Sequence, residues 1–217
     1  MAKWVKTVIG VALLPICIGV ARALWSVLAK AGPSDHVWVP MFAGAAAWWA
    51  IFLLLPKPML IYVYGHELTH AVWTWACGGR VKRFKATSKG GAVVVTKNNF
   101  LITLAPYFFP LYAVLIVIIF VVGRLIWNWD RYRVWFHLLV GATYAFHITL
   151  TWHILKTRQS DISDQGCLFS AVIIFLGNAV VLLLAMPLLT GSGHLLAALG
   201  QACSETGVVL CRISGIL

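Results

Sequence analysis

Two histidines and a glutamate lie close together in the segment YVYGHELTHAVWTW, residues 62–75. His66 and His70 are four residues apart, so on a helix both imidazoles lie on one face, one turn from each other, where they can share a metal ion. Glu67 projects beside such an ion, where its carboxylate can take a proton from an activated water and later pass it to a leaving amine. Two neutral imidazoles suit zinc, so the spacing predicts a site for one zinc ion.

A catalytic zinc site of this kind needs a third protein ligand, and a carboxylate commonly completes the two histidines. The chain has few other carboxylates to offer: Asp35, Asp130, Asp161, Asp164 and Glu205. Asp161 and Asp164 stand at the start of an apolar segment, where the N-terminus of a helix favours an anion. Each is therefore a candidate ligand, and the competing role for each is to cap that helix.

Other polar residues inside apolar segments are weaker candidates for chemistry. His137, His147 and His153 make no four-residue pair with another histidine, so we expect each to pack or to form hydrogen bonds rather than to bind a metal. Asn178 is a candidate for binding the backbone of a substrate. An asparagine in a membrane helix also commonly forms a hydrogen bond to a neighbouring helix.

The composition of the chain is that of an integral membrane protein. Of its 217 residues, 61% are hydrophobic and only 11% are charged, whereas soluble domains are about a quarter charged. The net charge is +11, but the basic residues stand mostly between apolar segments, which suits anionic lipid headgroups and argues against a nucleic-acid partner. The five cysteines are scattered, so they predict neither a disulfide framework nor a cysteine zinc site.

Hydropathy predicts an all-α polytopic membrane protein with about six transmembrane helices, each near the length needed to cross a bilayer. A small β-hairpin is expected after the helix that carries the histidines, at residues 80–97, with two short strands around Gly90-Gly91. There is no internal repeat, low-complexity tract or second domain, so the whole chain, 1–217, is expected to be a single integral membrane domain. The expected spans are about 5–28, 37–55, 59–77, 100–123, 134–155 and 167–189.

These features together resemble the site-2 protease family of intramembrane zinc metalloproteases, especially its small bacterial, M50B-like branch. The resemblance rests on GHELTHA within a span and on GGRVKRFKATSKGGAVVV, which is similar to the family's hairpin. It also rests on the proline-bearing NNFLITLAPYFFPLY and on the aspartates of RQSDISDQG, and it covers about residues 60–185. It implies zinc bound by His66, His70 and a late aspartate. Asp161 is preferred over Asp164 because the small branch places its aspartate several residues before a glycine. The family's common Asn-Pro and Leu-Asp-Gly setting is not present here.

The resemblance implies hydrolysis of peptide bonds within or next to transmembrane segments, by zinc-activated water with Glu67 as general base and acid. The implied partners are a membrane-embedded protein substrate and the lipid bilayer, in a bacterial-type cell membrane, with the hairpin at 80–97 as a candidate to hold the substrate as an added strand. The oligomeric state is not predicted. The alternative is a membrane metal-binding protein without proteolytic activity, either a transporter or a scaffold. Transporters usually spread their ligands over several spans and often show inverted repeats.

Overall fold

The computed structural model describes residues 2–32, 35–191 and 194–215. This part of the chain is mostly helical and contains one two-stranded sheet, as the sequence predicts. The helices and strands are α1 (Lys3–Ala31), α2 (Asp35–Leu54), α3 (Met59–Ala76), β1 (Val81–Thr87), β2 (Gly90–Val95), α4 (Phe100–Phe108), α5 (Leu111–Trp127), the 3₁₀ helix η1 (Trp129–Tyr132), α6 (Arg133–Leu155), α7 (Ser160–Gln165), α8 (Cys167–Thr190) and α9 (Leu195–Ile213).

Four helical segments are long and apolar enough to cross a membrane, which supports a multi-pass membrane protein. They are α1, α2, the continuous stretch Trp129–Leu155 and α8, and the bent pair of α4 and α5 makes a fifth if it is one span. Five of the six expected spans thus have a counterpart among the described residues, and the sixth, expected at 59–77, stays a prediction. Within the residues that the structure covers, α3 is not a candidate span, because the histidines and the glutamate that it carries lower its mean hydropathy.

The span expected at 100–123 is broken in the middle. The axes of α4 and α5 differ by 77°. Phe109, between them, has an extended backbone with φ −100° and ψ 105°. Pro110 explains this conformation, since a proline disfavours the helical region for the residue before it and cannot itself donate a helical hydrogen bond. The break produces a short helix, α4, whose residues from Ile102 to Phe108 are all buried.

The predicted hairpin is confirmed, but its turn lies elsewhere. Strands β1 and β2 pair antiparallel, from Val81 with Val95 to Thr87 with Gly90. The turn is therefore Ser88-Lys89. Gly90 and Gly91, which the sequence places at the turn, are the first two residues of β2.

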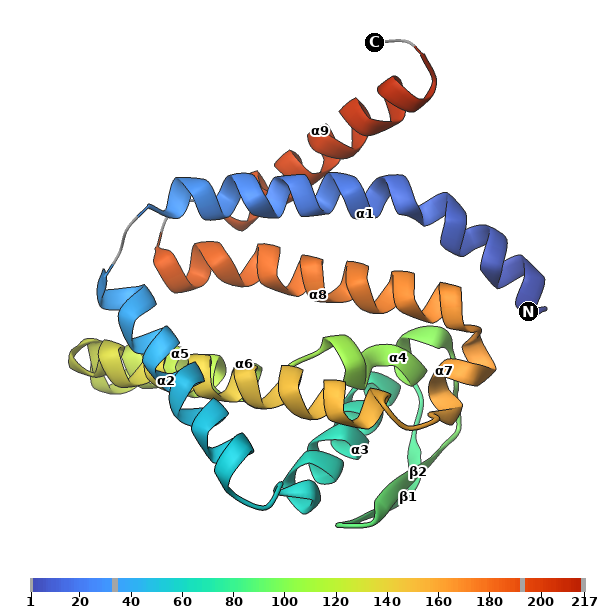
Figure 1. Ribbon diagram of the computed structural model, residues 1–217. Helices are drawn as coiled ribbons and strands as arrows, with labels where there is room; N and C mark the ends of the chain where they lie inside the picture. The colour runs from blue at the N-terminus through green and yellow to red at the C-terminus, as the bar shows by residue number, and fades with distance from the viewer. Residues whose placement is uncertain (1, 33–34, 192–193, 216–217) are drawn as a thin grey trace. The chain divides into compact units, whose positions relative to one another are not determined.

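The elements pack as two compact units, and the assignment of 1–217 to one domain stays a prediction. One unit joins the two ends of the chain and contains α1, α7, α8 and α9. Within it, α1 packs against α8 and α9 (Figure 1). The guanidinium of Arg22 on α1 forms an ion pair with Glu205 on α9 at 2.7 Å.

The other unit contains α2 to α6 and the hairpin. A buried cluster made by Trp48 of α2, Tyr62 and Val63 of α3, and Ala145 and Leu150 of α6 holds these three helices together. This cluster lies one turn before His66 on α3. It therefore fixes the part of α3 from which the predicted ligands project.

Candidate metal centre

The predicted histidine ligands lie on one face of α3. The ring centroids of His66 and His70 are 5.0 Å apart. The helix continues past both and ends at Ala76, and the N–H of Gly79 then bonds to the carbonyl of Thr74. Gly78 has a φ of +70°, a left-handed conformation that favours glycine after a helix end. The predicted pairing of the two imidazoles is seen, and the helix ends close to residue 77, where the expected segment 59–77 ends.

The absence of a side chain at residue 65 allows α5 to approach α3 just before His66. A Cβ at Gly65 would lie 2.6 Å from Cε2 of Tyr112, well inside van der Waals contact. The hydroxyl of Tyr112 donates a hydrogen bond to the carbonyl of Ile61 at 2.6 Å. Tyr112 therefore braces the turn of α3 that leads into the metal-binding pair.

A backbone carbonyl sets the orientation of the His70 ring. Nδ1 of His70 lies 2.8 Å from the carbonyl oxygen of Ile102 on α4. A carbonyl can only accept, so Nδ1 carries the proton and donates. Nε2 is then the nitrogen with a lone pair to offer a metal, which is the usual arrangement of metal-binding histidines.

The carbonyl of Ile102 is available to His70 because of a proline one turn later. In a helix this oxygen would accept from the N–H of residue 106, but Pro106 has no N–H to give. The backbone N–H of Ile102 is held as well, since it donates a hydrogen bond to the Asn99 side chain at 2.9 Å. Asn99 caps the start of α4. The short helix that ends at the bend before Pro110 therefore presents the carbonyl of Ile102 to the predicted ligand His70.

Glu67 is buried, with 7% of its surface exposed, and it lies against the hairpin. A Cβ at Gly91 of β2 would lie 2.5 Å from Cγ of Glu67 and 2.7 Å from its Oε1. The backbone of β2 therefore rests directly on the glutamate side chain. A contact between Tyr64 and Phe84, with ring centroids 5.5 Å apart, also joins α3 to β1. Sequence reasoning missed the role of Gly91, although the Gly-Gly pair was visible in the sequence.

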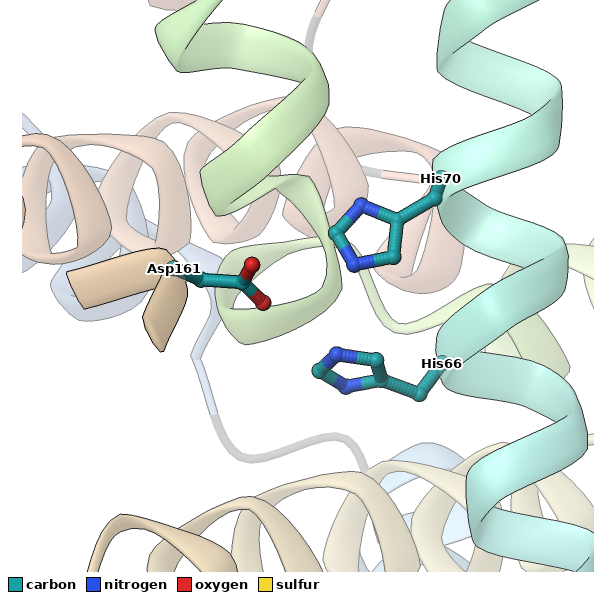
Figure 2. A group of neighbouring side chains, drawn as sticks. All are labelled: His66, His70 and Asp161. Carbon is teal, nitrogen blue, oxygen red and sulfur yellow. The ribbon is translucent and has the colours of Figure 1, made fainter. Parts of the chain in front are cut away.

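Asp161 belongs to the same group as the two histidines. Each of His66, His70 and Asp161 offers one ligand atom, and these atoms all lie within 4.8 Å of one another. Figure 2 shows the two rings and the carboxylate directed toward each other. A single tetrahedral zinc ion bonded to each ligand atom at about 2.1 Å needs these atoms about 3.4 Å apart. The separations of up to 4.8 Å are close to this distance. Two imidazoles and a carboxylate are also ligand types that zinc takes. Asp164, the alternative ligand, is not in this group.

The other residues weighed as candidates lie in different environments. Asp130 forms ion pairs with Arg124 and Arg133 at 3.0 and 2.9 Å, and Glu205 pairs with Arg22. The side-chain nitrogen of Asn178 donates to the carbonyl of Ile174 on its own helix, α8, at 2.9 Å. A role for Asn178 in substrate binding stays a prediction.

No protein-family model, no curated protein and no solved structure matches this chain. The resemblance to the site-2 proteases therefore stays a prediction based on the sequence motifs.

Proposed function

We propose that this chain is an intramembrane zinc metalloprotease, similar to the site-2 proteases, that hydrolyses peptide bonds within or next to transmembrane segments. The observation that carries the proposal is the gathering of His66, His70 and Asp161 beside a buried Glu67 in a chain with several candidate spans. Ionisable side chains that are buried away from water are costly and commonly functional, and Glu67 is buried. The proposed substrate is a membrane-embedded protein, and the proposed location is a bacterial-type cell membrane.

The proposed metal is one zinc ion, held by His66, by Nε2 of His70 and by the Asp161 carboxylate. Two imidazoles and a carboxylate leave a fourth position open, which is typical of catalytic zinc sites and not of structural ones. When bound, zinc would lower the pKa of water and polarise the carbonyl of the bond to be cut. The hydrogen bond from His70 to Ile102 supports the proposal, since metal-binding histidines usually donate their second nitrogen to such an acceptor.

Glu67 is the proposed general base and acid. It follows His66 directly on α3, and its buried carboxylate lies against β2. In this position it would accept a proton from the attacking water and then donate it to the amine that leaves the cut peptide. A carboxylate shielded from bulk water holds this geometry better than an exposed and mobile one.

The hairpin is the proposed support for the substrate. A peptide bond in a membrane helix is sheltered by its own helical hydrogen bonds, so the substrate must become extended before it is cut. An extended segment could add to an edge of the two-stranded sheet as a further strand. The contact between Gly91 and Glu67 would place a strand added next to β2 close to the general base.

Three variants, compared with wild type and with matched controls, test the proposal. Wild type, Glu67→Gln, His66→Ala and Asp161→Asn are purified, their bound zinc is measured, and the cleavage of a peptide containing one transmembrane segment is followed. Glu67→Gln should keep zinc and lose about 10²- to 10⁴-fold in rate, the usual contribution of a general base. His66→Ala and Asp161→Asn should lose zinc as well as cleavage.

The controls are the nearest chemical equivalents in the same chain. Glu205→Gln changes the other glutamate, and Asp164→Asn changes the neighbouring aspartate of α7. Both should keep zinc and cleavage. Cleavage by Glu67→Gln at the wild-type rate would rule out the protease, and a zinc flux across vesicles that survives Glu67→Gln would favour a transporter.

A further inference from the structure

His147 is a buried histidine on α6 whose Nε2 forms no hydrogen bond with the part of the protein that the structure describes. Its side chain is 7% exposed. Within residues 2–32, 35–191 and 194–215, no donor or acceptor forms a hydrogen bond with its Nε2. A buried polar atom without a hydrogen bond destabilises a protein, so such an atom calls for an explanation.

His147 lines a small cavity next to the candidate metal centre. The cavity has a volume of about 20 Å³, and both His66 and His147 line it. One water molecule needs about 10–15 Å³ of such space and two to four polar partners. The hydroxyls of Thr69 and Tyr112, which also line the cavity, already donate to the carbonyls of Gly65 and Ile61.

We infer that His147 holds one water molecule in this cavity and that this water bridges to His66. The water would donate a hydrogen bond to Nε2 of His147. It would accept one from the His66 ring nitrogen that faces away from the metal. This inference rests on the metal-binding part of the proposed function, but not on proteolysis.

With the inferred water, each of the two histidine ligands has a hydrogen-bond partner that orients its ring. His70 is oriented by a direct hydrogen bond to the carbonyl of Ile102. His66 would be oriented by the water and His147, which fixes the tautomer and direction of its ring in the same way. His147 is not itself in the group of potential ligands, so it is a positioning residue. Loss of such an outer partner typically weakens metal binding about 10- to 100-fold.

Zinc affinity, measured by competition with a chelator, tests the inference in wild type, His147→Leu, His147→Gln and His137→Leu. His137 is the matched control, because it is also on α6, is 4% exposed and has a buried Nδ1 without a hydrogen bond in the described chain. It does not line the cavity, and it lies about 15 Å along the helix from His147.

The expected result is a weakening of zinc binding of about 10- to 100-fold in His147→Leu and no change in His137→Leu. His147→Gln should bind zinc nearly as wild type does, because its amide reaches close to the position of Nε2 and can bond to the water. Wild-type affinity in His147→Leu, or an equal loss in His137→Leu, would overturn the inference.

A high-resolution structure of the zinc-bound wild type gives a second test that does not depend on how the variants fold. A water within hydrogen-bond distance of both Nε2 of His147 and the His66 ring supports the inference, and its absence overturns it. If the chain binds zinc but does not cut peptides, the proposed protease function is wrong and the inference about His147 still holds. If wild type binds no zinc, both fall.

Discussion

Replacement of Gly91 by alanine should disable the general base without unfolding the protein. The new Cβ would lie 2.5 Å from Cγ, 2.8 Å from Cδ and 2.7 Å from Oε1 of Glu67. Nonbonded carbon atoms sit about 3.5–4.0 Å apart, so the overlap amounts to about 1 Å. The φ of Gly91 is not positive, so the backbone of β2 at this position can accept alanine without strain.

The flexible partner in this contact is the Glu67 side chain, and we expect it to move. A misplacement of about 1 Å at a catalytic group can lower the rate about 10²-fold. Gly91→Ala should therefore reduce kcat for a transmembrane peptide by about this factor, while zinc content and thermal unfolding stay near wild type. The control is Gly207→Ala on α9, where an added Cβ meets nothing within 4 Å. Wild-type kcat in Gly91→Ala would refute the argument that the hairpin positions Glu67.

Three further predictions concern the support of the site and the fold. Pro106→Ala supplies an N–H that competes with His70 for the carbonyl of Ile102, so zinc affinity in a chelator titration should fall by about tenfold or more. Pro187→Ala in α8 is the matched control and should leave zinc affinity unchanged. Trp48→Phe removes the 2.8 Å hydrogen bond to Thr149 and should lower the free energy of unfolding by about 1–2 kcal/mol, measured by denaturation. Free zinc at about 100 times its dissociation constant should stabilise the fold by about 2.7 kcal/mol, seen as a higher Tm that a chelator reverses.

The sequence predicts the parts of the site that depend on local spacing. His66 and His70 face the same way because any helix puts residues four apart on one side, and Glu67 follows from the same helix. The hairpin was predictable because its β-branched residues and glycines come directly after a helix end. Asp161 and Asp164 show the limit of this reasoning, since residues three apart on a helix share a side and spacing alone does not choose between them.

The contacts between distant segments were not predictable in this way. The carbonyl of Ile102 reaches His70 only because α4 is short, capped by Asn99 and lacks a donor at Pro106. The prolines are visible in the sequence, but the sequence does not predict which side chain will donate to the carbonyl that Pro106 leaves without a helical hydrogen bond. The contact between Gly91 and Glu67 likewise depends on the turn lying at Ser88-Lys89, two residues earlier than expected.

Cleavage of a transmembrane peptide by zinc-loaded Glu67→Gln, compared with zinc-loaded wild type, tests the central claim most directly. Gln keeps the size of the side chain and its contact with β2, but it cannot act as a base. We expect equal zinc content in the two proteins and a rate lower by about 10²- to 10⁴-fold in the variant. Equal zinc content with equal rates of cleavage would contradict it.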